Sequence, residues 1–304
     1  MKKLKAYSII TTIIVLFVLL QGSVVTKTGS GQGCGTTWPL CFGNVIPYNP
    51  TLETIIEYTH RLISSVAGIL VLILSFWSWR KLNYIKEIKF FAILASAAII
   101  IQGLMGAGQV VFGQPPLIMA LHFGFSAISL AAVFTITFFT FEKQFNKVTV
   151  QVGIHFKRFI IVITIYAYAV IYTGAFVKHM GAAKVCTGFP LCNGEFVLFS
   201  QGTIVFAQMF HRLAGMVLTV FVIVFVFWVI KLYKHQRLLL SLSFVSLSLI
   251  FLQLLSGVGM VLTYNQNLTI GIIHALVISI LFSLFTYIVV ITRRIKQYFL
   301  IVII

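Results

Sequence analysis

The chain has 304 residues, of which 60% are hydrophobic and only 9% are charged. About a quarter of the residues in an ordinary soluble domain are charged, so this composition excludes that class and predicts an integral membrane protein. The net charge of +17 would suit a nucleic-acid-binding protein, but the basic residues lie between apolar segments and exclude a nucleic-acid partner.

Eight apolar segments are each long enough to cross the lipid bilayer as a helix, which takes about 20 residues. In chain order they cover residues 7–25, 60–79, 90–112, 117–139, 159–177, 211–230, 238–262 and 269–291. The first resembles a secretory signal, but its counterpart within the chain, 159–177, cannot be one, so we interpret the first as structure. The predicted fold class is an all-α integral membrane protein with eight transmembrane helices.

The basic residues predict the orientation in the membrane. Most of the 22 lysines and arginines lie at one set of helix ends, which the positive-inside rule makes cytoplasmic, together with both termini. These are Lys2, Lys3, Lys5, Arg80, Lys81, Lys86, Lys89, Lys143, Lys147, Lys157, Arg158, Lys231, Lys234, Arg237, Arg293, Arg294 and Lys296. We expect them to form a solvated, lipid-facing rim. The two long loops, 26–57 and 178–208, should lie outside.

The chain is duplicated. A shift of about 150 residues aligns landmarks of the two halves in order. The aligned pairs are Gly22 with Gly174, Gly29 with Gly181, Cys34 with Cys186, Cys41 with Cys192, His60 with His211, Gln102 with Gln253, Gly106 with Gly257, Gly108 with Gly259 and His122 with His274. We therefore predict two tandem, pseudo-symmetric four-helix bundles in the same orientation, residues 1–145 and 146–304.

Four of the seven histidines occupy duplicated positions. His60 and His211 are expected to begin the second helix of each unit, and His122 and His274 to lie about one turn into the fourth. Alternate helices run in the same direction, so each pair should face one site at similar depth. A lone histidine at a helix end is usually an interfacial residue, but two pairs in register argue for ligands.

Two imidazoles without a carboxylate or thiolate cluster suit the axial positions of a haem iron better than tetrahedral zinc. Arg61 and Arg212 follow the first histidine of each pair, where a guanidinium can bind a haem propionate. His155, His179 and His235 receive no role as ligands, and we expect the last two to be solvated loop residues.

All four cysteines fall in the outer loops, an oxidising compartment, so we predict the local disulfides Cys34–Cys41 and Cys186–Cys192. A redox role and a purely structural role are both open for the first disulfide, whereas the second is expected to be structural.

The two copies differ where Glu57 occupies the position of Gln208. Glu57, His60 and Arg61 share one helical face. Glu57 could simply pair with Arg61 or interact with the helix N-terminus. The alternative is that it contacts a reacting molecule in the first unit alone.

The paired loop cysteines, the stretches EYTHR (57–61) and QMFHR (208–212), the two later histidines and the eight-span layout resemble the bacterial haem A synthase family over essentially the whole chain. The resemblance implies a plasma-membrane oxidoreductase that converts the C8 methyl of haem O into the formyl group of haem A through an alcohol. His60 and His122 would then flank the iron of haem O, with Glu57 close by, and His211 and His274 would ligate haem B. Further expected partners are the membrane enzyme that makes haem O and an electron acceptor.

Two histidines fill both axial positions of an iron, so we expect a route that withdraws electrons from the methyl group and adds water, with Glu57 as a base or as the stabiliser of a developing cation. The main alternative is a dihaem electron carrier resembling cytochrome b, which would use the same four histidines. A membrane thiol oxidoreductase and a haem chaperone are further alternatives.

Overall fold

The computed structural model describes residues 1–142, 148–195 and 202–294. Within these ranges it has eight α-helices, all long and apolar enough to cross a membrane, and no β-strand beyond two isolated bridges. The helices are α1 (Lys2–Lys27), α2 (Leu52–Lys81), α3 (Ile88–Val111), α4 (Pro116–Phe141), α5 (Ile154–His179), α6 (Thr203–Leu232), α7 (Arg237–Leu262) and α8 (Leu268–Arg293). The predicted all-α membrane fold is confirmed.

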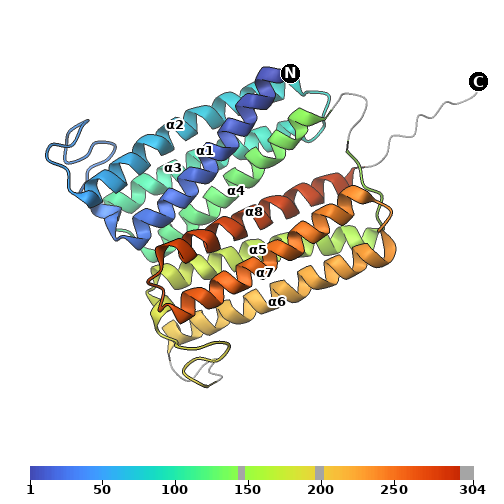
Figure 1. Ribbon diagram of the computed structural model, residues 1–304. Helices are drawn as coiled ribbons and strands as arrows, with labels where there is room; N and C mark the ends of the chain where they lie inside the picture. The colour runs from blue at the N-terminus through green and yellow to red at the C-terminus, as the bar shows by residue number, and fades with distance from the viewer. Residues whose placement is uncertain (143–147, 196–201, 295–304) are drawn as a thin grey trace, which may run out of the picture.

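The helices form two groups of four that lie side by side (Figure 1). In the first group each helix packs on the next, and α1 also packs on α4, so that α1 to α4 close into a bundle. The same contacts recur for α5 to α8, with α5 packed on α8. This arrangement agrees with the predicted duplication, although the boundary predicted at residues 145 and 146 lies outside the described residues.

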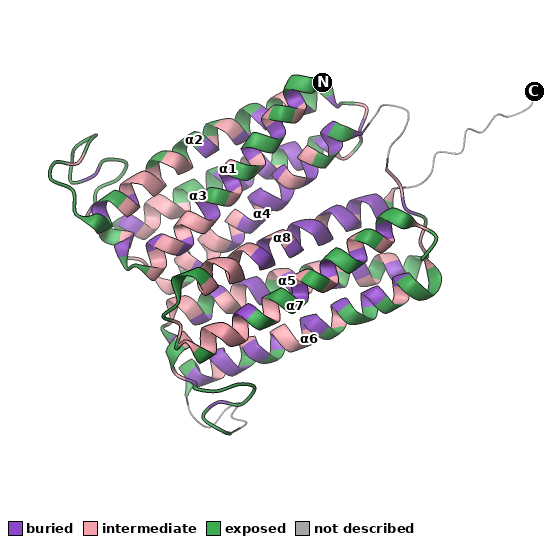
Figure 2. Cartoon of the chain, viewed as in Figure 1, coloured by how far each residue is buried: buried purple, intermediate pink, exposed green. Residues whose placement is uncertain are grey.

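Helix α8 lies at the junction of the two bundles, packed on α1 and α4 of the first bundle. It is the most buried of the described helices, as the purple stretch along it in Figure 2 shows. Small residues let helix backbones approach closely within a membrane. At Gly124 on α4, for example, a Cβ atom would lie only 2.3 Å from Tyr172 Cζ on α5. The halves are therefore closely packed against each other.

Two helices begin earlier than predicted. Helix α2 starts at Leu52 rather than at residue 60, and α6 starts at Thr203 rather than at 211. The added turns of α2 are partly polar, and the hydroxyl of Thr51 caps them by accepting a hydrogen bond from the Thr54 amide at 3.3 Å. Hence His60 and His211 do not begin their helices but lie more than two turns inside them.

The chain leaves α1 and α5 in the same way. A 3₁₀ turn follows each helix, at Ser30–Gln32 and at Ala182–Lys184. Each turn is preceded by a glycine in the left-handed region, Gly29 with φ of 71° and Gly181 with φ of 70°, a conformation that costs glycine little. The described loop residues that follow, 28–51 and 180–195, define what we call the loop end of the molecule.

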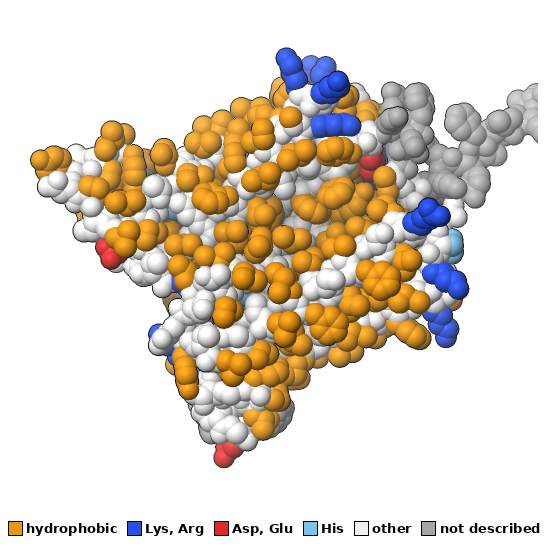
Figure 3. All heavy atoms as spheres, viewed as in Figure 1, with side chains coloured by type: hydrophobic (Ala, Val, Ile, Leu, Met, Phe, Trp, Pro, Cys, Tyr) orange, Lys and Arg blue, Asp and Glu red, His pale blue; other side chains and the backbone are white. Residues whose placement is uncertain are grey.

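The opposite end, which carries Met1 and Arg294, is called the terminal end. Most lysine and arginine side chains visible in Figure 3 gather there, whereas hydrophobic side chains cover the flank of the helices. Lys143, Lys147 and Lys296, which the sequence places in the same basic set, lie outside the described residues. Arg294 is an exception to the expected solvated rim, because its side chain is only 5% exposed.

Candidate functional site

All four paired histidines line one cavity of about 790 Å³ near the loop end. His60 comes from α2 and His122 from α4, and in the second bundle His211 comes from α6 and His274 from α8. The structure thus brings together the residues of each predicted pair, and it also joins the two sites through a common space.

His122 is oriented by the neighbouring helix. Its Nδ1 atom lies 2.8 Å from the carbonyl oxygen of Gln102 on α3. A carbonyl oxygen only accepts hydrogen bonds, so Nδ1 carries the proton and donates it. The lone pair of His122 Nε2 then remains available to a ligand.

His211 has an equivalent arrangement with a different partner. The hydroxyl of Thr173 on α5 donates to the carbonyl oxygen of Val170 at 2.8 Å, and its oxygen lies 2.8 Å from His211 Nδ1. With its proton already used, the hydroxyl accepts a hydrogen bond from His211 Nδ1. Again Nε2 is left with its lone pair.

His274 contacts two side chains of α7. The hydroxyl of Ser256 donates to the carbonyl oxygen of Gln253 at 3.0 Å and accepts from His274 Nδ1 at 3.0 Å. The amide nitrogen of Gln253 lies 3.1 Å from His274 Nε2, where it donates to the lone pair. Iron would take the place of this amide donor.

His122, His211 and His274 therefore carry their proton on Nδ1, so that the lone pair of each ring is on Nε2. An orienting hydrogen bond of this kind on the far nitrogen is typical of histidines that bind metals. His60 differs from the others, because its Nδ1 atom is buried and has no hydrogen-bond partner among the described residues.

Glycines bring a neighbouring helix against each histidine ring. A Cβ atom at Gly174 would lie 2.8 Å from His211 Cε1, and one at Gly257 would lie 3.2 Å from His274 Cε1. In the first bundle the corresponding distances are 3.3 Å for Gly22 and His60 and 3.4 Å for Gly106 and His122. The duplicated glycines thus leave room for the rings.

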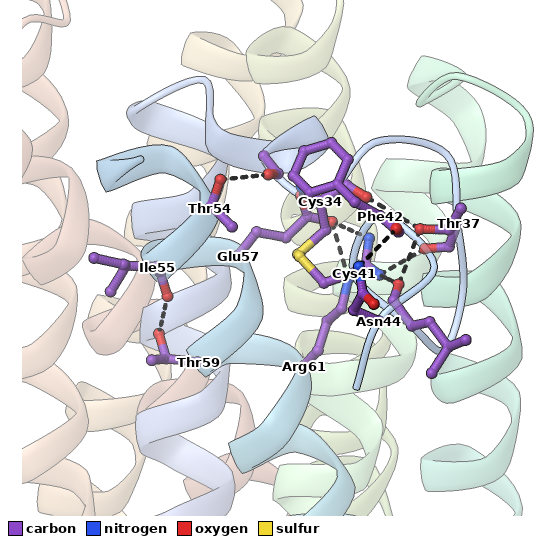
Figure 4. The surroundings of a disulfide bond; sticks show 12 residues. Cys34, Thr37, Cys41, Phe42, Asn44, Thr54, Ile55, Glu57, Thr59 and Arg61 are labelled. Atoms are coloured by element: carbon purple, nitrogen blue, oxygen red, sulfur yellow. Dashed lines mark hydrogen bonds and ion pairs between the residues drawn. A yellow bond between two sulfur atoms is a disulfide. The ribbon is translucent and has the colours of Figure 1, made fainter. Parts of the chain in front are cut away.

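The loop between α1 and α2 is held against the site by a buried ion pair (Figure 4). Glu57 accepts from the Cys34 amide at 2.8 Å and from Arg61 Nε at 3.0 Å, and it also pairs with an Nη2 proton of Arg61. Arg61 Nη1 donates to the carbonyl oxygens of Thr37 at 2.7 Å and Leu40 at 2.9 Å. Both oxygens of Glu57 are therefore occupied by the loop and by Arg61.

Arg212 holds the second loop through backbone oxygens. Its Nη1 atom lies 2.9 Å from the carbonyl oxygens of both Gly188 and Leu191, and its Nη2 atom lies 3.3 Å from that of Cys186. Arg61 and Arg212 line the cavity, but the structure assigns their hydrogen bonds to the loops. Their predicted pairing with propionates remains a prediction.

Both predicted disulfides are present. Cys34 and Cys41 have Cα atoms 4.5 Å apart, and Cys186 and Cys192 have Cα atoms 4.7 Å apart. The backbones of Cys41 and Asn44 form an isolated antiparallel β-bridge, and those of Cys192 and Glu195 form an equivalent one. Trp38 from the first loop and Phe189 from the second line the cavity, so these loops contribute to its wall at the loop end.

Sequence reasoning missed several residues of the site. Thr173 and Ser256 orient histidines, and no motif marks them. Gln102 and Gln253 could have been found, since the duplication keeps them, but we assigned them no role. His179 was expected to be solvated, yet it is the last residue of α5 and lines the cavity. His235, as expected, is exposed.

The site suits a haem better than a bare metal ion. No group of three or more histidine, cysteine or acidic side chains is placed to hold a metal ion in the part of the chain that is described. Zinc sites need three or four protein ligands, whereas a haem iron takes two axial ones. Buried amide atoms of Gln102, Gln109 and Gln253 have no hydrogen-bond partner among the described residues, and these side chains line the same cavity, which leaves polar groups for a bound molecule.

The fold and the site define a class: duplicated eight-helix membrane proteins with a pair of facing histidines in each half. Residues 5–286 match the COX15-CtaA family, described as cytochrome oxidase assembly protein. The chain belongs to this family.

Several relatives in this class are named heme A synthase. The one from Alkalihalophilus pseudofirmus is 49% identical over 294 residues, which cover 96% of this chain and 98% of the relative. The one from Shouchella clausii is 47% identical over 302 residues, 97% of this chain and 99% of the relative. The one from Halalkalibacterium halodurans is 48% identical over 296 residues. The resemblance to the haem A synthase family is confirmed.

Proposed function

We propose that this chain is a haem A synthase, an oxidoreductase that converts the C8 methyl group of haem O into the formyl group of haem A through a hydroxylated intermediate. The observation that carries the proposal is the two pairs of histidines on one cavity, in a chain with relatives named heme A synthase along nearly its whole length. A haem bound there supplies the iron and the conjugated ring that exchange electrons.

We assign different tasks to the two halves. His60 and His122 would hold haem O or its products, and His211 and His274 would hold haem B as the electron-transfer group. The differences between the copies support this division, because Glu57 and Gln109 of the first half correspond to Gln208 and Met260 of the second. All four of these side chains line the cavity.

The chain's own residues position the substrate and control protons. Three imidazoles are fixed by hydrogen bonds of Nδ1, so their Nε2 atoms are preorganised as ligands. Glu57 is the only cavity-lining carboxylate among the described acidic residues. A role as a base requires it to release Arg61 or the Cys34 amide first, because both of its oxygens are engaged.

We place the loop end outside the bacterial plasma membrane and the terminal end in the cytoplasm. The basic residues at the terminal end support this orientation. The two disulfides, in this proposal, hold the loops over the cavity. An electron acceptor and the membrane enzyme that makes haem O are the proposed partners.

Haem extraction tests the proposal. Cells that make haem O but lack this protein should contain no formyl haem, and expression of the full chain should produce it. His122→Ala should abolish the product while the second haem is still bound, with His235→Ala as the control on an exposed histidine. Unaltered haem B in both sites, and no formyl haem in the cells, would instead identify a dihaem electron carrier.

A further inference from the structure

Four lysine and arginine residues line the cavity within the described ranges: Lys27, Arg61, Lys178 and Arg212. The two arginines donate to loop carbonyl oxygens, and Arg61 is also paired with Glu57. The two lysines lie at the ends of α1 and α5, although Lys27 is aligned with His179 by the duplication and not with Lys178. They are the cations left to interact with a bound anion.

Lys27 extends from the first bundle into the second. Its Nζ atom donates to the carbonyl oxygen of Asn267 at 2.8 Å and to that of Asn265 at 3.3 Å, both in the link between α7 and α8. A Cβ atom at Gly271 would lie 2.7 Å from Nζ, so the lysine passes directly over the first turn of α8. Gly271 lies three residues before His274, on the same face of the helix.

The side chain of Lys27 is therefore next to the second histidine pair, although it belongs to the first half of the chain. Lys27, Lys178 and His274 all line the cavity. An ammonium group has three protons to donate, and Lys27 uses two of them on the backbone. The third is available to another acceptor.

No carboxylate of the chain balances this charge at the cavity. The sequence has five acidic residues. Glu57 is engaged by Arg61 and the Cys34 amide, Glu87 and Glu142 bind Arg294, and Glu53 and Glu195 are exposed and do not line the cavity. Two like charges beside an apolar space are unfavourable unless an anion joins them.

We propose that Lys27 binds a propionate of the haem held by His211 and His274, so that the first half of the chain completes the haem site of the second. This inference rests on the proposed function, because that function supplies the haem. A propionate accepts a charge-assisted hydrogen bond from an ammonium group, one of the stronger polar contacts in proteins.

A titration of the full chain with two haems tests the proposal. The parent variant carries His60→Ala and His122→Ala, so that only the second pair binds, and is purified in detergent from haem-deficient cells. It is titrated with haem B and with haem B dimethyl ester, whose propionates carry no charge. The Soret band measures the bound fraction.

Adding Lys27→Gln to this parent should weaken binding of haem B about tenfold, the effect of losing one charge-assisted hydrogen bond, and leave binding of the ester unchanged. Lys27→Arg should restore the preference for haem B. Lys184→Gln removes a neighbouring, exposed lysine that does not line the cavity and should change neither affinity.

Equal losses for haem B and the ester would mean that Lys27 only supports packing, and would overturn the proposal. Unchanged binding of haem B by Lys27→Gln, or an equal loss with Lys184→Gln, would overturn it as well. If neither the parent nor the unmodified chain binds haem, the proposed function fails together with this inference.

Discussion

The hydroxyl of Thr173 decides which nitrogen of His211 faces the cavity. Because that hydroxyl donates to its own helix at Val170, it can only accept from the imidazole, which fixes the proton on Nδ1. Sequence alone located all four histidines, since they repeat in register. It could not locate Thr173, because threonine is common in apolar helices and its partner here is 38 residues away.

Thr173→Val should therefore weaken haem binding in the second half about tenfold, the lower end of the effect of losing such an orienting contact. The change preserves the shape of the side chain and removes the acceptor for His211 Nδ1 together with the hydrogen bond to the Val170 carbonyl oxygen. The haem-to-protein ratio after detergent purification measures it. Thr164→Val is the matched control, since the Thr164 hydroxyl donates to Ile160 of its own helix, and an equal loss in both variants would contradict the prediction.

Gln109 is a second residue-scale difference between the sites. Its buried Nε2 atom has no hydrogen-bond partner within the described part of the chain, and the residue lines the cavity, whereas the second half has Met260 at the equivalent position. Haem O carries a hydroxyl group on its farnesyl-bearing side chain that haem B lacks. An unpartnered amide donor suits this hydroxyl.

Gln109→Met, which copies the second half, should reduce the preference of the first site for haem O over haem B by about threefold to tenfold, the effect of one neutral hydrogen bond. Competition titrations with the two haems in a His211→Ala, His274→Ala background would measure it. The reciprocal Met260→Gln, made in the unmodified chain, should leave the first site unaffected. An unchanged preference in Gln109→Met would show that the amide does not contact haem O.

At the scale of elements, the loop between α1 and α2 is fixed by the first turns of α2. Hydropathy located the spans but placed the start of α2 at residue 60, because Glu53, Thr54 and Glu57 lower the apolar content there. The start at Leu52 follows instead from local signals, namely the Thr51 cap and the acidic first turn. These extra turns carry Glu57 to the loop, so the missed boundary concealed the ion pair.

Glu57→Gln should lower the free energy of unfolding by about 2 kcal/mol, since an amide satisfies only part of the hydrogen bonding of Arg61 and the Cys34 amide. Thermal unfolding in detergent and proteolysis of the loop 28–51 measure this effect. Arg61→Gln breaks the same ion pair and also frees the loop carbonyl oxygens of Thr37 and Leu40, and it is the comparison for turnover. If Glu57 acts only through the loop, both variants lose activity equally.

If Glu57 also transfers a proton, Glu57→Gln should lose about 100-fold more turnover than Arg61→Gln, with both haems still bound. Normal turnover in Glu57→Gln would remove the residue from the proposed chemistry.

At the scale of the whole molecule, the repeat predicted two similar bundles but not how they join. A duplicated pattern specifies contacts within each unit, because both copies carry them, whereas the junction depends on residues that occur once. Glu87, Glu142 and Arg294 are of this kind. The sequence suggested only that Arg294 belongs to a solvated basic rim, and this prediction was wrong.

Arg294 connects the end of α8 to two elements of the first bundle. Its Nη1 atom lies 2.7 and 2.8 Å from the two carboxylate oxygens of Glu142, beyond the end of α4, and its Nε atom lies 3.1 Å from Glu87, before α3. Burial by itself would lower the pKa of Arg294, but the hydrogen bonds with Glu87 and Glu142 raise it above the ordinary value. The guanidinium therefore stays charged, and the two carboxylates depend on it.

Arg294→Met should destabilise the junction of the bundles by about 3 kcal/mol, because it removes the guanidinium that pairs with the Glu142 side chain, which is only 2% exposed. The expected result is a lower midpoint of thermal unfolding in detergent and earlier proteolysis between the halves. Arg293→Met removes the neighbouring exposed arginine and should leave the midpoint unchanged. Adding Glu87→Gln and Glu142→Gln to Arg294→Met should recover part of the loss, since these changes remove the two carboxylate charges that Arg294 balances. Equal midpoints for Arg293→Met and Arg294→Met would mean that helix packing alone holds the halves together.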